Sequence, residues 1–511
     1  MTPQINSQNI HSVPEAERIE AALNHPDVAQ AMTLHGILRN AAASGIGRKY
    51  GFTTITRIRQ FAERVPVGGV HTHRSMIELQ RATGAPILTG GDIVDHLPGR
   101  SLGKPVNFPV SAADRDRRAF LAGISLDRIL GQTGTRAGRL IDLSNLADPQ
   151  KTGPFSGRSD RVRSCDDISG IADAEVRIYL TLLLLVSEAD VSGLIAPSAD
   201  VFLHLEEVLD RDAHMLLADL EARTVRVHDR MPRELATAVR DCLSVDAAHL
   251  QNLVDLHRRT GRLGLADLLP SLRGVVLYED AAGGEAVSAL LPDGAEIIDA
   301  GCWRPEGVLS FAAGEPGYGG IPALLDIYFE FECGRAPEPV GLHELREGED
   351  YRVMVTTASG LYRCRLDLSA RVTGWAGKCP RLQFWAAGEA SVAGRRRPPV
   401  ESGAALKAVQ AVMRELEAPR PFVRFTHHRD GGCRVIVNAA TLESIDRDTL
   451  ARAIDRRLGE ISLRYRRHRD LGRIGPVEIA ASPATCGPCT PQPAADATGG
   501  LLRVRSSRRM A

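Results

Sequence analysis

Apolar residues recur at helical spacing along much of the first half of the chain. Over residues 14–62 this repeat predicts two helices, and it stops at the glycines within residues 45–51. Further helices are expected over residues 173–190 and 197–222. Gly and Pro crowd residues 87–110, so we expect a loop there, bracketed by short strands.

After about Gly274 the pattern changes to an alternation of apolar and polar residues, which is typical of strands. Helices that come first and strands that come later predict an α/β or α+β body. The segments expected to be strands are 274–278, 295–299, 327–331 and 351–357.

A smaller unit is expected near the C-terminus. Residues 389–399 are rich in Gly, Arg and Pro and resemble a hinge or linker between a large body over 14–388 and a small α+β domain over 400–482. Residues 483–511 show no periodicity, which is typical of a disordered tail. The small domain is predicted from strands at 422–425 and 433–437, a helix over 446–465 and a closing strand at 476–479.

Composition narrows the class of protein. With 511 residues, 43% of them hydrophobic, the chain suits a globular protein of two to four domains. Its 63 Lys+Arg balance 63 Asp+Glu, which argues against a nucleic-acid or anionic-membrane partner. No apolar run is long enough for a membrane span or a signal peptide. Nine scattered cysteines do not suit a disulfide framework, so we expect a reducing cytoplasm.

The cationic residues are almost all arginines, a bias typical of GC-rich, bacterial coding sequences. A mechanism that needs a catalytic amine therefore has few candidates. The lysines are Lys49, Lys104, Lys151, Lys378 and Lys407.

Several segments, taken in chain order, match one enzyme family. The clearest run comprises residues 328–331, 342–351, 355–366 and 371–374. Weaker matches lie at 38–52, 61–67, 86–89, 173–179, 196–198 and 446–475. On these residues the chain resembles the Gretchen Hagen family of acyl-acid amido synthetases, which comprises the plant auxin- and jasmonate-conjugating enzymes and their bacterial relatives.

The resemblance implies an α/β fold of the adenylate-forming type, with a large N-terminal domain and a small α+β C-terminal domain. It also implies a ligase that uses ATP and Mg²⁺ to adenylate a small-molecule carboxylic acid. The amine of an amino acid then attacks the acyl carbon. Adenylation creates a good leaving group, and the enzyme contributes positioning and charge stabilisation.

The family's nucleotide loop is matched by residues 98–110. The resemblance assigns phosphate binding to Gly99, Arg100, Ser101, Gly103 and Lys104, whose backbone and side-chain donors suit an anion. The expected run of hydroxyl residues is absent, however. An ordinary surface turn is the alternative interpretation.

The second motif is matched by Cys302–Gly307, which reads Cys-Trp-Arg-Pro-Glu-Gly. Glu306 is the expected magnesium ligand, although Pro305 replaces a serine and Cys302 replaces an aromatic residue that would stack on adenine. The alternative is a solvent-facing turn.

The third motif is matched by Tyr362–Leu368. The ribose-binding acid is expected at Asp367, one position early, and Leu368 occupies the usual place of the acid. A one-residue shift in a strand reverses the side chain, so ribose binding by Asp367 requires a local bulge. Arg363 and Arg365 are expected to contact phosphate, or alternatively to be paired charges at the rim of a strand.

Two histidine pairs are the other candidates for chemistry, His71 with His73 and His427 with His428. Neither has acids or cysteines at ligand spacing, so we interpret them as exposed loop histidines.

Three altered nucleotide motifs leave a second function open. The chain is either an adenylating acid–amino acid ligase or a degenerate family member that acts as a non-catalytic binding or regulatory scaffold. None of the motifs identifies the acid, the amine acceptor, the oligomeric state or the pathway.

Overall fold

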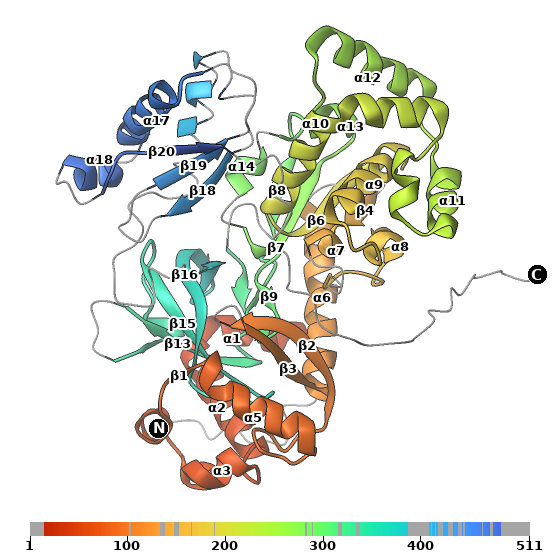
Figure 1. Ribbon diagram of the computed structural model, residues 1–511. Coiled ribbons are helices and arrows are strands. Elements are labelled where there is room, and N and C mark those ends of the chain that lie inside the picture. The colour runs from red at the N-terminus through yellow and green to blue at the C-terminus, as the bar shows by residue number, and fades with distance from the viewer. Residues whose placement is uncertain are drawn as a thin grey trace, which may run out of the picture.

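The structure is a computed structural model, and the residues that it describes lie within 15–481. They form a mixed α/β fold with a smaller α+β unit at the C-terminal end, as the sequence predicts (Figure 1). Excluded from the description are 102–103, 133–137, 148–152, 165, 189, 282–283, 289, 315–318, 334–337, 387–407, 410, 414, 417–422, 428–432, 438–441, 443–444, 462 and 471–473.

The N-terminal segment contains more and shorter helices than the two predicted over residues 14–62. Pro26 begins the second helix, and Gly51 (φ 64°) ends the third in the left-handed conformation that favours glycine. Ser44 caps the third helix, because its Oγ accepts a hydrogen bond from the N–H of Gly47 at 3.0 Å. The elements are α1 (Glu15–Asn24), α2 (Pro26–Asn40), α3 (Gly45–Tyr50), η2 (Phe52–Thr54), α4 (Ile58–Arg64), β1 (Gly68–Gly69) and α5 (Val70–Thr83).

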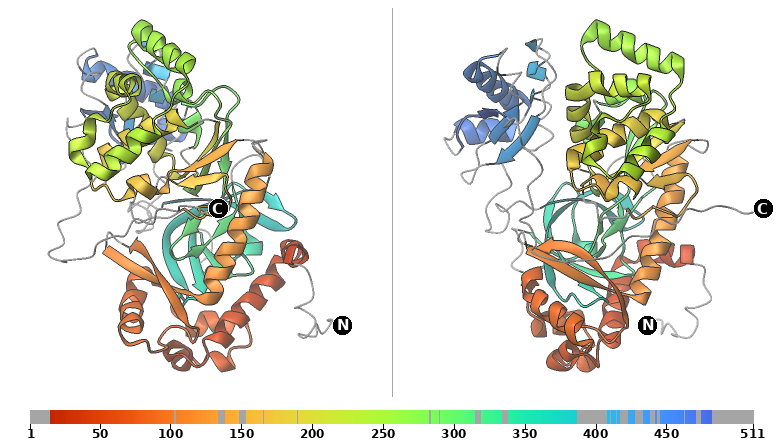
Figure 2. Two further views of the ribbon diagram at one scale, coloured as in Figure 1. Left: turned by 90° about the vertical axis from the view of Figure 1, so that its right-hand side faces the viewer. Right: turned by 45° about the vertical axis from the view of Figure 1, so that its right-hand side comes forward.

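The prediction of a loop over residues 87–110 is wrong. This stretch contains most of an antiparallel hairpin of β2 (Ile93–Ser101) and β3 (Lys104–Ser111). Proline and glycine are tolerated here because each strand of a two-stranded ribbon has a free edge. The hairpin leads into α6 (Ala112–Gln132). This helix runs from the N-terminal helices towards the lobe formed by residues 139–299, which lies at the top of Figure 1 and is called the upper lobe below (Figures 1 and 2).

The upper lobe contains a five-stranded parallel sheet in the order β5-β4-β6-β7-β8. The strands predicted at 274–278 and 295–299 are confirmed as β7 and β8. The strands are β4 (Arg139–Asp142), β5 (Val162–Ser164), β6 (Val191–Ser198), β7 (Gly274–Asp280) and β8 (Glu296–Asp299). The helices are α7 (Ser144–Ala147), α8 (Asp166–Ser169), α9 (Ala174–Ser187), α10 (Asp200–Ala222), η3 (Arg226–Arg230), α11 (Arg233–Cys242), α12 (Ala247–Thr260), α13 (Leu265–Leu268) and α14 (Gly284–Ser288).

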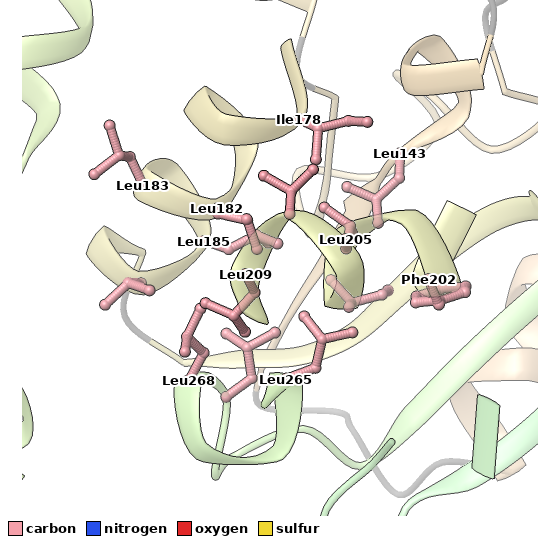
Figure 3. Packing of buried hydrophobic residues seen from close by; sticks show 14 of the residues in the cluster. Leu143, Ile178, Leu182, Leu183, Leu185, Phe202, Leu205, Leu209, Leu265 and Leu268 are labelled. Carbon is pink, nitrogen blue, oxygen red and sulfur yellow. The ribbon is translucent and has the colours of Figure 1, made fainter. Parts of the chain in front are cut away.

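The helices predicted over 173–190 and 197–222 are confirmed as α9 and α10. Asp173 caps α9 by accepting from the N–H groups of Glu175 and Val176. Most of α9 is apolar and buried because neighbouring helices cover it. In the core of this lobe, side chains from α9, α10 and α13 face one another (Figure 3), among them Leu182, Leu185, Leu205, Leu209, Leu265 and Leu268.

A second sheet lies between this lobe and the N-terminal helices (Figure 1). Its order is β1-β16-β15-β13-β14, with β17 also paired to β16, and only the β1–β16 pairing is parallel. The strands predicted at 327–331 and 351–357 are confirmed as β13 and β15. The bounds are β9 (Trp303–Arg304), β10 (Gly307–Val308), β11 (Ser310–Phe311), β12 (Ile321–Pro322), β13 (Ile327–Glu332), β14 (Val340–Gly341), η4 (Leu342–Glu344), β15 (Asp350–Thr357), β16 (Cys364–Ala376) and β17 (Cys379–Ala386).

The C-terminal unit has its own apolar core, formed by described residues between Ala408 and Val477. The predicted strands and helix are present, although the helix is divided into α17 and α18. The boundaries at 388 and 400 stay predictions, because the linker at 389–399 and the tail at 483–511 lie outside the described residues. The unit comprises β18 (Val423–His427), β19 (Cys433–Val437), α17 (Arg447–Ile461), α18 (Leu463–Asp470) and β20 (Glu478–Ala481). Across the described part of the chain, no helix combines the length and apolarity that a bilayer crossing requires.

Candidate functional site

Glu306 lies in a tight turn between two short strands. β9 and β10 pair so that Arg304 faces Gly307, which leaves Pro305 and Glu306 at the centre of the turn. The side chain of Glu306 is only 5% exposed, so the interpretation of this segment as a solvent-facing turn is wrong.

The Glu306 carboxylate is incompletely satisfied. Its Oε2 lies 3.4 Å from Nε of Arg304, but no group in the described part of the chain forms a hydrogen bond with this oxygen. Burial opposes the charge of Arg304, yet the charges of Glu306, Cys302 and Glu279 outweigh it and raise the pKa of that guanidinium. A buried carboxylate oxygen without a hydrogen bond suits a hard cation.

The donor set around Glu306 fits Mg²⁺ only in combination with phosphate or water oxygens. Among the residues described, no three His, Cys, Asp or Glu side chains are grouped so that they could hold a metal ion. Mg²⁺ is commonly held by one or two carboxylates together with substrate phosphates. Glu306 therefore fits the role of a single protein ligand to a phosphate-bound ion.

The hairpin packs directly against the Glu306 turn. A Cβ atom on Gly99 would lie 2.8 Å from the ring of Phe108 and 3.2 Å from Cγ of Pro305. Gly99 is therefore required by close packing between β2, β3 and the turn. This contact brings the first and second predicted motifs together.

The rest of the predicted phosphate loop is described only in part. The backbone of Arg100, Ser101 and Lys104 belongs to the strands, where Arg100 pairs with Pro105 and Ser101 with Lys104. Gly103 and these three side chains lie outside the described residues. Phosphate binding by this group stays a prediction.

Arg363 is buried beside the second sheet. Its Nε lies 3.0 Å from Oε1 of Glu330, and its Nη1 donates to the carbonyl oxygens of Ala62 and Val65 at 2.7 and 3.0 Å. The guanidinium is thus surrounded by protein acceptors. This geometry favours a structural role over the predicted phosphate contact.

Arg365 and Asp367 lie on the outer face of β16, and Leu368 lies on the buried face. Arg365 forms a salt bridge to Glu332, with Nη2 2.5 Å from Oε1, and this hydrogen bond raises the pKa of the guanidinium. The pairing of β15 and β16 is irregular here, since residues 366–368 lie opposite the single residue 353, but Asp367 and Leu368 still lie on opposite faces, so ribose binding by Asp367 stays a prediction.

Cys364 shows that β16 and the Glu306 turn are close in space. Burial raises the pKa of the Cys364 thiol, the charges of Glu306 and Asp367 raise it further, and Arg365 opposes them. The charges of Glu306, Arg365 and Asp367 thus all act on this one thiol. Cys302, by contrast, is 1% exposed in the core, so it does not offer a surface for adenine.

The histidines do not form a metal site in the described part of the chain. His73 lies in α5 and is buried, so its interpretation as an exposed loop residue is wrong; His71, in the same helix, is exposed. His427 ends β18, and His428 lies outside the described residues.

A cavity of about 760 Å³ opens beside Glu306. Helices α1, α2 and α6 line it, together with the turn residues Glu306 and Gly307 and the segments 325–327 and 357–358. Its volume is within the range of roughly 300–1,000 Å³ that is usual for small-molecule sites. The sequence did not reveal this cavity, because its lining comes from parts of the chain that are far apart in sequence.

Two arginines of α6 form part of the cavity wall. Arg117 is engaged by Asp326 at 2.6 Å and by Glu15 at 2.5 Å. Arg118 donates to Asp114 at 2.7 Å and to the carbonyl oxygens of Arg304 and Pro305 at 2.9 and 3.1 Å. These three bonds use three of the five N–H groups of Arg118. Arg118 thereby fixes the Glu306 turn and still has donors for a ligand.

Comparison with known proteins gives short matches to plant enzymes. The chain is 43% identical over 63 residues to a jasmonoyl–L-amino acid synthetase of Nicotiana attenuata, which is 11% of each chain. It is 29% identical over 182 residues to a probable indole-3-acetic acid-amido synthetase of Oryza sativa subsp. japonica, 30% of this chain and 36% of that enzyme. The matched regions therefore cover 11% and 36% of the lengths of these two plant enzymes, which is much less than two thirds.

Solved structures match the fold over nearly the whole chain. An acyl acid amido synthetase, AtGH3.15, in complex with 2,4-DB has a TM-score of 0.67 and 18% identity, covering 94% of this chain and 90% of that one. A 2-hydroxyisobutyryl-CoA ligase in the postadenylation state has a TM-score of 0.51 and 14% identity, covering 95% and 92%. At these identities the likeness shows a shared fold.

Two family models also match in sequence. The GH3 family N-terminal domain matches residues 15–276 and the GH3 family central domain matches residues 321–386. The first match alone covers more than half of the 511 residues and contains the hairpin and α6. The second contains β13, β15 and β16. The chain therefore belongs to the GH3 family.

Proposed function

We propose that this protein is an ATP-dependent acyl-acid amido synthetase that joins a small carboxylic acid to the amine of an amino acid. The observation that carries the proposal is the buried Glu306 carboxylate, with one oxygen free of hydrogen bonds, at the edge of a 760 Å³ cavity. The family and the matched fold support the same chemistry.

The proposed reaction has two steps. A carboxylate oxygen of the acid attacks the α-phosphorus of ATP, and pyrophosphate leaves with the electrons of the broken P–O bond. The amino group then attacks the acyl carbon, AMP leaves, and a proton is lost from nitrogen. The protein contributes orientation and charge stabilisation to both steps.

The described residues suit distinct parts of this reaction. Arg118, with two N–H groups beyond its three protein bonds, is placed to orient the acid's carboxylate at the cavity wall. Asp367 is exposed on the bulged strand and suits the ribose hydroxyls, while Arg365 suits a phosphate. Gly99, Arg100, Ser101, Gly103 and Lys104 are proposed for the remaining phosphate contacts.

Glu306 is the proposed ligand for Mg²⁺. When bound, the ion neutralises phosphate charge and so assists departure of pyrophosphate. The Arg304 guanidinium lies beside Glu306, with Nε 3.4 Å from Oε2, and so adds a positive charge at this buried carboxylate.

We further propose a cytoplasmic location and a bacterial source. The location is supported by the free cysteines among the described residues, Cys242, Cys302, Cys333, Cys364 and Cys379. The source is supported by the preference for arginine over lysine.

The test is ATP–pyrophosphate exchange with a broad panel of carboxylic acids. Wild-type protein is expected to catalyse exchange, and Glu306→Gln is expected to lose at least about a hundredfold of the rate, in line with removal of one preorganised charge group. Glu296→Gln is the matched control, because Glu296 is an exposed strand residue. Absence of exchange with every acid overturns the proposal.

One observation favours a second candidate, a non-catalytic binding scaffold. Leu368 is buried where the family's acid is expected, and Arg363 is engaged by Glu330. A scaffold would show no exchange with any acid, while acids or ATP would still shift its melting temperature. Exchange that depends on Glu306 would exclude it.

A further inference from the structure

The cavity beside Glu306 has a polar side whose charges are already compensated. Arg117 is paired with Asp326, and Arg118 is paired with Asp114. Arg18, another of the lining residues, is paired with Glu15 at 2.6 Å. The described lining therefore offers partial donors to one carboxylate but no unpaired arginine to a second anionic group.

Much of the remaining lining of the cavity is apolar and small. Helices α1 and α2 contribute residues with side chains no larger than a methyl group, namely Ala21, Ala22, Ala29 and Gly36. A Cβ atom on Gly36 would meet no atom within 4 Å. The wall at this point of α2 therefore borders open space.

Two of the apolar side chains that line the cavity are exposed to solvent. Val28 and Met32 line it and are 44% and 50% exposed. They lie four residues apart on α2, so they occupy the same face of the helix. Gly36 continues this face by one further turn. Val28, Met32 and Gly36 thus form one apolar track along the cavity wall.

We propose that Gly36 determines acyl specificity, so that the cavity accepts a monocarboxylic acid with an extended, uncharged apolar tail that passes Gly36 and reaches Val28 and Met32. This inference rests on the proposed function, which places the carboxylate of the acid at the Arg118 side of the cavity. A tail along the track would cover apolar surface that is otherwise exposed to water.

The first experiment measures binding without ATP. Isothermal titration calorimetry with straight-chain acids from propanoate to dodecanoate is expected to show affinity that rises with chain length. Each methylene that becomes buried should tighten binding about fourfold, the equivalent of about 0.8 kcal/mol. Hexanedioate should bind at least about tenfold more weakly than hexanoate, because its second carboxylate would be desolvated without a partner. A flat series, or equal binding of these two acids, overturns the proposal.

The second experiment blocks the track. Gly36→Leu is expected to weaken dodecanoate binding at least about tenfold, since a loss of two buried methylenes already corresponds to this factor. Propanoate binding should be unchanged. Gly123→Leu is the matched control, because Gly123 is a helix-interior glycine of α6 that also has no atom within 4 Å of its Cβ and does not line the cavity. Both substitutions replace a glycine within a helix by a better helix former, so both variants should keep the wild-type fold. Equal dodecanoate affinities in the two variants overturn the proposal.

Pyrophosphate exchange separates this inference from the proposed function. Exchange that is independent of chain length, and unaffected by Gly36→Leu, overturns the tail specificity and leaves the ligase function in place. Chain-length-dependent binding that Gly36→Leu abolishes, without exchange, supports the apolar track and overturns the ligase function.

Discussion

Glu330 and Arg363 form an ion pair inside the protein, with Oε1 of Glu330 2.9 Å from Nη2 of Arg363 and each side chain 7% exposed. Burial raises the pKa of the Glu330 carboxyl, and the hydrogen bond and charge of Arg363 oppose this. Arg363 also adopts φ 42°, an unusual conformation for a residue other than glycine. Its bonds to Ala62 and Val65 connect the end of α4 to the second sheet, so the pair holds the N-terminal helices in place.

Arg363→Ala is expected to lower the free energy of unfolding by about 3–5 kcal/mol, because it leaves the Glu330 carboxylate buried without a partner. Urea unfolding followed by circular dichroism measures this. Arg365→Ala is the control, since Arg365 is 40% exposed in its salt bridge to Glu332, and it should cost about 1 kcal/mol or less. If Arg363→Ala instead leaves stability intact and raises only the KM for ATP, the predicted phosphate contact is correct.

Gly99→Ala is expected to separate the hairpin from the Glu306 turn, because the new methyl group would lie 2.8 Å from Phe108 and 3.2 Å from Pro305. Overpacking of this kind costs about 1–3 kcal/mol. It should also raise the KM for ATP, as the two nucleotide segments move apart. Gly91→Ala is the control, because its nearest atom would be in ordinary contact at 3.7 Å. Equal melting temperatures and equal KM values in the two variants would contradict this account.

Asp367→Asn is expected to change stability by no more than about 0.5 kcal/mol, because the side chain is exposed. If Asp367 binds ribose, the KM for ATP should rise about tenfold, which corresponds to a charge-assisted hydrogen bond of about 1.5 kcal/mol. Comparison of ATP with 2′-deoxy- and 3′-deoxy-ATP identifies the hydroxyl. Wild-type protein that uses all three nucleotides equally would exclude ribose binding by Asp367.

The long, strongly periodic elements were predictable from sequence. Helix α9 and strands β7, β13 and β15 are largely buried, so each has enough apolar residues for its type to be recognised in the sequence. The hairpin was missed because Pro98, Gly99 and Pro105 disfavour strands in general, and the free edges of a two-stranded ribbon remove that objection. Such edges depend on tertiary structure.

The site was predictable only where a motif keeps its residues together. Glu306 was identified with its neighbours, but its burial depends on the hairpin and on Arg118, which are distant in sequence. The cavity was not foreseen for the same reason. A local sequence signal for this part of the site is the pair of opposite charges on Asp114 and Arg118, which lie four residues apart at the beginning of α6.

His73 provides the clearest test of pH dependence. It is buried in α5, with Nδ1 3.1 Å from the carbonyl oxygen of Gly69 and Nε2 3.1 Å from that of Tyr362. Burial lowers the pKa of the imidazole from 6.5 and outweighs these two hydrogen bonds, which favour the charged ring. The contact with Tyr362 lies directly before Arg363, so His73 supports the same junction as the Glu330–Arg363 pair.

The unfolded chain therefore binds a proton at His73 at a higher pH than the folded protein does. The stability from neutral His73 is fully present above pH 6.5 and is lost as pH falls through the folded-state pKa, by up to about 1.4 kcal/mol per pH unit within that interval. Urea unfolding at pH 8 to 5 measures this slope. His73→Gln should remove it, whereas His71→Gln should keep most of it, because the charge of His71 is the smallest of the causes. A slope in His73→Gln equal to that of the wild type would assign the pH dependence to another group.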